Sequence, residues 1–514
     1  MMQLKRQQII QIFVVACAIL LLIVKAPFAI AEVPPDVRDS ISTPDEVDTS
    51  IGTLHFFDGV PTPETTETVY DDLDRMRGTD AFLKGIPLAS VYGLMEGQYS
   101  LGATAAHQVI IFDQLMDSES LYLTANTSTL YTWGVLDLKR DGATVIDVPP
   151  GMLGMINDAA FDWIVDIGPA GPDEGNGGKF LVLPPDFEGA IPEGYFVVPT
   201  KAYRHSLFLR TSIADGIDQA ANLIKNNLKV YPFSQKDNPP AMEFVSASGK
   251  AFNTVHANNF KFYEELDAVI QYEPYGLIDR ERRGLFASIG IEKGKAFAPD
   301  ARMEAILTDA VAIGNAAARS IVWYPRVDGT LQGVQHYPDT DSSWLMGYTG
   351  RNVFFTGEDG ETMNSDARVM FHYPYTYVSP AMATPQEGTG SDYGVAYLDS
   401  NKQFFDGSKT YQLHIPADPP AKDFWAVTIY DSQTRSMLQT GQPFPTVGSQ
   451  TEGIQQNADG STDVYFCPQP PTGYENNWLE TVPGKSWFVI FRMYGPLQPW
   501  LDQSWRPGEV ELLD

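Results

Sequence analysis

The sequence has almost no cysteine, with only Cys17 and Cys467 among its 514 residues. Cys17 lies in an apolar N-terminal run that we expect to be removed, so the mature chain keeps Cys467 alone. An intramolecular disulfide is then excluded, and stability has to come from the burial of apolar side chains. Cys467 follows the β-type run Val464-Tyr465-Phe466, which favours a small buried side chain over a reactive thiol.

Basic residues are also scarce. The chain has 35 Lys and Arg against 65 Asp and Glu, and its net charge is −30. A chain this acidic repels phosphate backbones, so we expect no nucleic-acid partner. A cationic or basic partner stays open, although acidic surfaces often serve solubility alone.

Several catalytic signatures are missing. The sequence has no Gly-x-Ser-x-Gly elbow, no His-Glu-x-x-His helix and no paired-cysteine zinc pattern. The stretch GNGGKF (175–180) has Phe180 where a phosphate loop needs Ser or Thr. The sequence therefore predicts no metal and no cofactor.

The first 31 residues have the features of a signal peptide. Lys5 and Arg6 precede the apolar run 9–24, and Ala29-Ile30-Ala31 is a small-x-small cleavage signal. We expect cleavage after Ala31, a periplasmic or secreted protein, and no membrane contact afterwards. An uncleaved anchor or a lipoprotein at Cys17 are the alternatives. Cleavage leaves 483 residues with a net charge of −33, since the segment holds three basic residues and no acidic one.

The remaining chain divides by its patterning. Residues 32–50 are polar and proline-rich, which predicts a flexible lead. Residues 51–210 begin with helical spacing and change to short strands near 121, residues 211–320 have helical periodicity, and residues 321–514 return to strands. Because strict β/α alternation is absent, we expect an α+β protein with two antiparallel β-sandwich, jelly-roll-like domains, a helical middle segment and N-terminal helices.

Several motifs in order resemble a known family. ANTSTLYTWGVLDL (125–138), VIDVPPG (145–151) and KFLVLPPDFEGAIPEGYFVV (179–198) resemble exported bacterial proteins that carry domain of unknown function 1254 (DUF1254). YQLHIPADPPAKDFWAVTIYD (411–431) and the stretch 457–496 resemble their usual C-terminal partner, DUF1214. The resemblance implies two jelly-roll-like units with helical insertions, and it allows a homo-oligomer. It brings no established reaction and no site residues.

Two acidic residues are the catalytic candidates. We expect one strand over 161–167, with Phe161, Trp163 and Val165 on the core face. Asp158, Asp162 and Asp166 surround Trp163, and Asp162 or Asp166 could meet an acid of another strand at the spacing used in glycoside hydrolysis. Asp158 and Asp162 are the candidates for such paired carboxylates. A solvated polar face is the alternative that the pattern favours. Trp163 is a ligand-binding candidate because aromatic faces stack on sugar rings.

Two further ligand-binding candidates, His372 and Tyr373, lie in MFHYPYTY (370–377). Four aromatic residues in this short stretch indicate either a pocket wall or, as the pattern favours, a packed aromatic cluster.

The strand 486–494 carries an arginine among apolar neighbours. Arg492 shares one face with Phe488 and Ile490, and a buried arginine must be paired. Its partner is either Asp431, as a structural contact, or an anionic ligand. Asn477 and Trp478 precede this strand in a loop, where binding residues often lie, and complete the ligand-binding candidates.

Three functions stay open from these patterns. The first is an exported protein that binds a small molecule or a glycan in the cell envelope. The second is a carbohydrate-active or related hydrolase or lyase that uses carboxylates, and the third is a structural subunit of an envelope assembly. Whether the protein is an enzyme is left undecided.

Overall fold

The computed structural model describes residues 34–513, and the predicted signal peptide lies outside them. The chain divides into two compact units at Leu73 and Asp74. The first unit holds α2 (Pro35–Ile41) and an antiparallel sheet of β1 (Glu46–Thr49), β2 (Gly52–Phe57) and β3 (Val60–Pro61). The segment 32–50, for which a flexible lead is predicted, thus contains α2 and β1, and β1 pairs with β2 in a tight hairpin. Helix α3 (Pro63–Ser100) continues from this unit into the second.

The second unit begins with two sheets that share a core. The six-stranded sheet has the order β13 (Glu243–Ser246), β4 (Gln108–Ile111), β5 (Leu130–Asp137), β11 (Arg204–Thr211), β7 (Met152–Asp158), β8 (Trp163–Ile167). The four-stranded sheet has the order β10 (Phe196–Pro199), β9 (Gly178–Leu183), β6 (Thr144–Val148), β12 (Lys229–Pro232). Alternate side chains of both, such as Leu207 and Val182, meet in one apolar cluster.

Two more sheets form the C-terminal part. The larger has the order β14 (Trp344–Leu345), β15 (Ser391–Ala396), β22 (Ser486–Pro496), β18 (Ala421–Asp431), β19 (Thr446–Gly448), and β16 (Phe405–Asp406) also pairs with β22. The smaller has the order β21 (Trp478–Glu480), β20 (Thr462–Cys467), β17 (Tyr411–Ile415), β23 (Val510–Leu512). Trp487, Val489 and Phe491 of β22 pack with Leu413 and Val464 between them.

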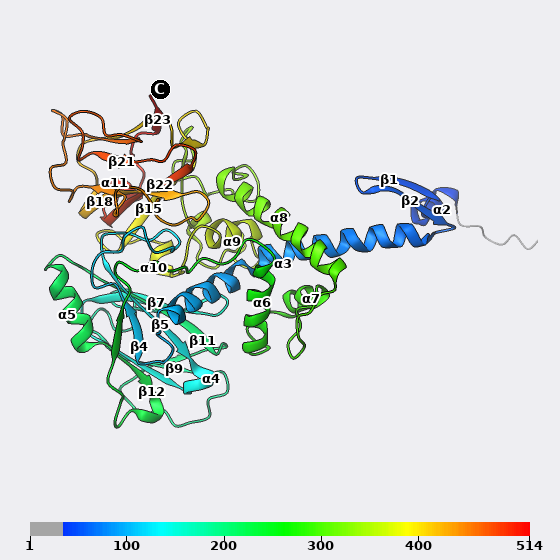
Figure 1. Ribbon diagram of the computed structural model, residues 1–514, viewed down its shortest axis with the longest axis horizontal. Helices are drawn as coiled ribbons and strands as arrows, with labels where there is room; N and C mark the ends of the chain where they lie inside the picture. The colour runs from blue at the N-terminus through cyan, green and yellow to red at the C-terminus, as the bar shows by residue number, and fades with distance from the viewer. Residues whose placement is uncertain (1–33, 514) are drawn as a thin grey trace, which may run out of the picture. The chain divides into compact units, whose positions relative to one another are not determined.

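A third core lies between the two larger sheets. Their inner faces contribute Trp133 and Phe208 from one side and Phe488 and Ile490 from the other. Side chains from the end of α3 and from five helices join this core: α6 (Lys261–Tyr272), α7 (Arg280–Ser288), α8 (Ala301–Trp323), α9 (Ser365–His372) and α10 (Pro380–Ala383). Figure 1 shows α9 and α10 between the cyan and green strands and the orange strands. We call this region the central layer.

The remaining helices are short. They are α4 (Leu138–Asp141), α5 (Ile217–Asn227), which packs on the N-terminal sheets, α11 (Gln498–Leu501), and the 3₁₀ turns η1 (Phe233–Gln235) and η2 (Thr349–Arg351). Among the described residues, α8 alone has the length and apolarity of a membrane span. Its side chains Leu307, Val311 and Val322 belong to the central layer, as expected for a core helix.

The helices and mostly antiparallel sheets confirm the α+β prediction. Two details of the predicted organisation differ. The segment 211–320 holds β12 and β13 besides its helices, because both strands pair back onto N-terminal strands. Residues 321–390 contribute mainly α9, α10 and loops to the central layer, and the long strands begin at β15.

Candidate anion-binding cavity

The central layer contains a cavity of about 90 Å³, with room for on the order of six water molecules or a small organic molecule. Its walls come from both larger sheets and from the segments between them. The ionisable groups that line it are three arginines, one carboxylate and several phenols: Arg210, Arg351, Arg492, Asp392, Tyr122, Tyr131, Tyr348, Tyr375, Tyr377 and Tyr393.

Arg210 reaches the cavity from the N-terminal sheet. It alternates with Phe208 on β11, so both side chains leave the inner face while Leu209 enters the core between the sheets. Only 9 % of Arg210 is exposed, and its buried Nε has no hydrogen-bond partner. The titratable groups that act on its guanidinium are the phenols of Tyr393, Tyr131 and Tyr494, and Tyr393 is also hydrogen-bonded to it. The charge of Arg210 is therefore buried without a carboxylate beside it.

Arg492 enters from the opposite sheet. Its predicted face is confirmed, since Phe488 and Ile490 of the same strand line the central layer. Its Nη2 donates to the backbone oxygens of Thr124 at 2.9 Å and Ala125 at 3.4 Å, whereas the buried Nη1 has no partner. Only 3 % of the residue is exposed.

Asp431 is not the partner of Arg492, so the predicted structural contact is wrong. Asp431 lies opposite Trp487 in the ladder, at the other end of the pairing, where it accepts from Gln433 N at 2.6 Å and pairs with Lys485. The arginine instead faces loop 124–126, which belongs to the ANTSTLYTW stretch and is distant in sequence.

Arg351 differs from the other two arginines because it has a counter-ion. Both of its terminal nitrogens donate to the Asp392 carboxylate, at 2.6 and 2.7 Å, and Trp500 Nε1 donates to the same carboxylate at 2.8 Å. Asp392 is thus fully used. The remaining charge of the cavity is that of Arg210 and Arg492, and it is positive in a strongly acidic chain.

Tyr393 lies next to both unpaired arginines. It is the cross-strand neighbour of Arg492, and its ring centroid is 5.7 Å from that guanidinium. Its hydroxyl is 2.7 Å from Ser391 Oγ. Burial alone would raise the pKa of Tyr393, but the positive charges of Arg210 and Arg492 and the bond to Ser391 outweigh it, and the pKa is lowered.

Aromatic rings make up much of the rest of the wall. Phe208 stacks on Tyr377 with centroids 4.3 Å apart, and Tyr348 packs against Phe371 at 4.4 Å. Ser206 and Tyr377 share a hydrogen bond of 2.7 Å that joins the N-terminal sheet to the central layer. The cavity therefore presents two uncompensated cations beside flat apolar surfaces, which suits an anion with an apolar body.

The predicted catalytic acids serve a turn. Oδ1 of Asp158 accepts from the backbone N of Ala160 and Asp162, and Phe161 between them has φ +62°. Strand β8 accordingly begins at Trp163, and the strand predicted from 161 is wrong at its start. Asp158 is fully buried, with its pKa raised to about 7 by burial and by the nearby charge of Asp162.

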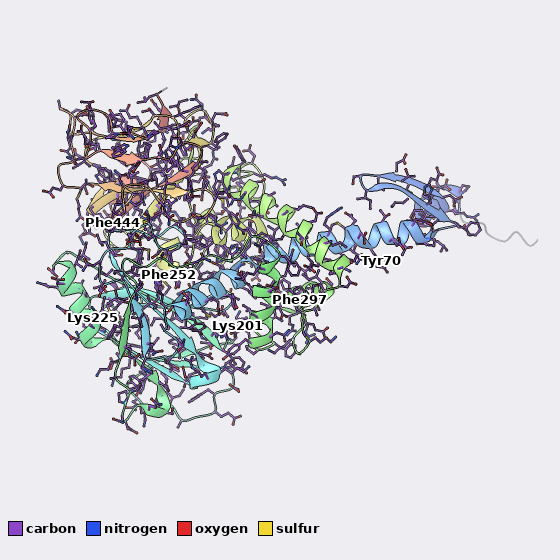
Figure 2. All side chains as sticks on the ribbon, in the orientation of Figure 1. Tyr70, Lys201, Lys225, Phe252, Phe297 and Phe444 are labelled. Atoms are coloured by element: carbon purple, nitrogen blue, oxygen red, sulfur yellow. The ribbon has the colours of Figure 1, made fainter. Side chains whose placement is uncertain are left out.

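Asp162 and Trp163 line a second, open hollow of about 670 Å³. There the Asp162 carboxylate is 2.6 Å from the ammonium of Lys201, which Figure 2 labels. His372, at the end of α9, lines the same hollow, is buried against Phe161 and has its pKa lowered to about 3 by burial and by the charge of Arg368. The structure thus brings three predicted residues together, but apart from Arg492.

Tyr373 is not a wall of either hollow. Its hydroxyl donates to Asn315 Oδ1 at 2.5 Å, and its ring lies 4.2 Å from the guanidinium of buried Arg435. The packed aromatic cluster, which the pattern favoured, describes it correctly.

Asn477 and Trp478 hold backbone segments together. The Asn477 amide bridges Gln455 and Asp463 through backbone atoms, and Trp478 Nε1 donates to the Cys467 oxygen at 2.8 Å. Neither residue lines the cavity or the open hollow. No group of three metal-ligating side chains occurs in residues 34–513, so no metal site is assigned there.

Arg210, Tyr393 and Arg351 escaped the sequence analysis. One signal was present for Arg210: it ends RHSLFLR (204–210), in which Phe208 and Arg210 alternate with apolar residues on a buried strand. An arginine at such a position needs a partner for the same reason as Arg492.

Two family models match the two regions of the chain that supply most of the cavity walls. The family model described as a protein of unknown function (DUF1254) matches residues 107–232, and the one described as DUF1214 matches 390–498. A search of curated proteins gives no match. Arg210 lies in the first matched region, and Tyr393 and Arg492 lie in the second.

One solved structure has a similar fold, and a second shows weaker similarity. The VPA0106 protein from Vibrio parahaemolyticus is 17% identical, with a TM-score of 0.50 over 86% of this chain and 100% of that chain. An uncharacterized protein from Burkholderia cenocepacia is 11% identical, with a TM-score of 0.37 over 88% of this chain and 97% of its own. The family models thus place DUF1254 at residues 107–232 and DUF1214 at residues 390–498, and the cavity between the larger sheets draws on both matched regions.

Proposed function

We propose that this protein is an exported binding protein for a small organic acid, whose carboxylate Arg210 and Arg492 hold in the cavity. The observation that carries the proposal is the burial of two guanidinium groups with no carboxylate beside them. Removing an unpaired charge from water costs several kcal/mol, and a bound anion would offset that cost. Paired Arg351 in the same wall gives the contrast.

The chemistry of the wall narrows the ligand. The planar fork of arginine matches a carboxylate through two parallel hydrogen bonds. The apolar rings of Phe208 and Tyr377 and the side chain of Ile490 suit a hydrocarbon or aromatic body. The cavity volume limits this body to a small one. A neutral glycan would leave both arginines uncompensated.

Two finer interpretations accompany this proposal. We infer that each pair of sheets forms a jelly-roll-like sandwich, because alternate side chains of both sheets meet in one core. Export through residues 1–31 would place the protein in the periplasm or outside the cell. N-terminal sequencing of the protein from the periplasmic fraction tests this, since an N-terminus at Glu32 is expected and an intact Met1 would contradict it.

The carbohydrate-active alternative has less support. Oδ1 of Asp158 is used in a turn, and Asp158 does not line the open hollow beside Asp162. Only one of the two predicted acids is therefore in contact with space that a substrate could fill.

Ligand binding by the mature chain tests the proposal. Straight-chain acids from acetate to octanoate, benzoate and phenylacetate are compared with their amides by thermal shift and calorimetry. A ligand at 100 times its Kd should add about 2.7 kcal/mol to stability. We expect at least one acid to bind and its amide to fail.

Variants locate the binding. Arg210→Met should lower the affinity for the tightest-binding acid roughly tenfold or more, because one charge-assisted contact is lost. Arg492→Lys should lower this affinity as well, since lysine lacks the planar, forked guanidinium group. Arg326→Met, at an exposed arginine, is the control. Equal binding of acid and amide, or full binding by Arg210→Met, would overturn the proposal, and a panel without any binding would favour the structural subunit.

A further inference from the structure

A second arginine site lies outside the cavity. The open hollow of about 670 Å³ and a neighbouring hollow of about 620 Å³ share Arg282, Arg368 and Met363 in their walls. We call the two together the groove. It is bounded by α7 and α9 of the central layer and by the β8 edge, and none of the side chains that line the cavity belongs to it.

Arg368 is the unpaired cation of the groove. It lies on α9, is 8 % exposed and lines both hollows, and its buried Nε has no hydrogen-bond partner. Burial and the nearby charge of Arg282 lower the pKa of Arg368 to about 10.

The surrounding carboxylates are already used. Asp162 pairs with Lys201 at 2.6 Å, and Asp279 pairs with Arg282 at 2.7 Å while it also caps α7. Asp80 pairs with Lys84 at 2.7 Å. The three acids whose charges act on Arg368 therefore each have their own cation, and Glu281 in the same hollow is exposed on α7. The charge of Arg368 remains available to a ligand.

Aromatic surfaces flank this charge. Phe354 is 62 % exposed in the wall of the larger hollow, and half-buried Trp163 lies in the same wall. Flat apolar faces pack on the C–H faces of sugar rings, and the paired ions Asp162 and Lys201 offer an acceptor and donors for hydroxyl groups.

We propose that the groove binds an acidic oligosaccharide, with a uronate carboxylate on Arg368 and a sugar ring against Phe354 and Trp163. The position of Arg368 between two hollows allows more than one sugar unit. A carboxylate matches the planar fork of the Arg368 guanidinium through two parallel hydrogen bonds. This site is independent of the cavity, so either proposal can fail alone.

The test is calorimetry of the mature chain with galacturonate oligomers of three to six units. The matched neutral probe is the galactose oligomer, which has the same ring and no carboxylate. We expect the acidic oligomer to bind, the neutral one to bind at least tenfold more weakly, and the affinity to fall as salt is added.

Variants separate a site from a structural role. Arg368→Gln should lose roughly tenfold or more in affinity, with an unchanged or higher Tm because no buried partner is left behind. Phe354→Ala, at an exposed ring, should weaken binding without unfolding, and Arg368→Lys should recover part of it. Arg210→Met is the matched control in the cavity and should bind the oligomer normally.

Three results would overturn the proposal: no binding of any acidic oligomer, equal affinity for the neutral oligomer, or full affinity in folded Arg368→Gln. If Arg368→Gln fails to fold, Phe354→Ala decides, and its unchanged affinity counts against the site.

Discussion

The cavity and the groove each combine one paired arginine with unpaired arginines, two in the cavity and one in the groove, but at different depths. In the cavity, Arg351 holds Asp392, whose side chain is only 4 % exposed. In the groove, Arg282 holds Asp279, whose side chain is 56 % exposed. The pairing is alike, so the surroundings should decide what each pair contributes to stability, and the unpaired arginines beside them should contribute to binding.

The largest effect is expected for Asp392→Asn. Removing the carboxylate leaves Arg351 unpaired in a largely buried setting, which costs about 3 kcal/mol or more. Denaturation in urea measures this cost as a lower midpoint. A midpoint equal to that of the parent within experimental error would show that burial does not increase the contribution of this ion pair to stability.

Arg210→Met should change the stability of the protein in the opposite direction. This change removes a buried guanidinium whose Nε has no partner, and it supplies an apolar side chain of similar length. Without ligand, the variant should be more stable than the parent by about 1 kcal/mol. Its affinity for the organic acid should fall at the same time. A lower midpoint would mean that Arg210 serves the fold, and the contrast with Arg351 would collapse.

Below the groove, Asp158 provides a pH test. Its pKa is raised to about 7 in the folded chain, against an ordinary value of 3.8. Between these values the folded state keeps a proton that the unfolded state releases, so stability due to this group is present below pH 3.8 and is lost as pH rises through 7. Asp158→Asn should therefore gain stability over the parent as pH goes from 5 to 8.

Thermal unfolding of both proteins at several pH values measures the difference. The buried histidines contribute equally to both and cancel. Asp215→Asn, at an exposed turn residue, is the control. A difference that stays constant with pH would contradict the raised pKa.

The smallest effect is expected for Asp279→Asn, the counterpart of Asp392→Asn. The amide oxygen can still cap α7 through Arg282 N, so only the exposed ion pair is lost. Exposed pairs contribute about 0.2 to 1 kcal/mol, and salt should reduce the difference further. A loss as large as that of Asp392→Asn would break the link between burial and strength.

The sequence predicted the local part of this arrangement. Because alternate residues of a strand point to the same face, Phe488, Ile490 and Arg492 were predicted to share one face. The predicted burial of that face implied a partner for the arginine. The partner itself could not be predicted, because loop 124–126 and Arg492 meet only through the packing of two sheets. Asp431 was the nearer choice along a neighbouring strand, and pairing placed it at the wrong end.

The groove residues show a similar limit. Asp162, Trp163 and His372 were each identified singly, and nothing in their spacing predicted one shared hollow. Phe161 was assigned to a strand by alternation, but the Asp158 carboxylate stabilises a turn there through its contacts to Ala160 and Asp162. Hydrogen bonds from a local side chain to the backbone replace strand pairing at this position.

Arg492 and Arg210 reach the same cavity from different domains, and this has a reciprocal consequence. Any ligand that both arginines hold joins the DUF1254 and DUF1214 sheets as an additional cross-link. By thermodynamic linkage, the free energy with which the packed sheets favour the ligand equals the free energy with which the ligand favours their packing. A bound acid would thus stabilise the packing of the two sheets against unfolding, by an amount that grows with its affinity.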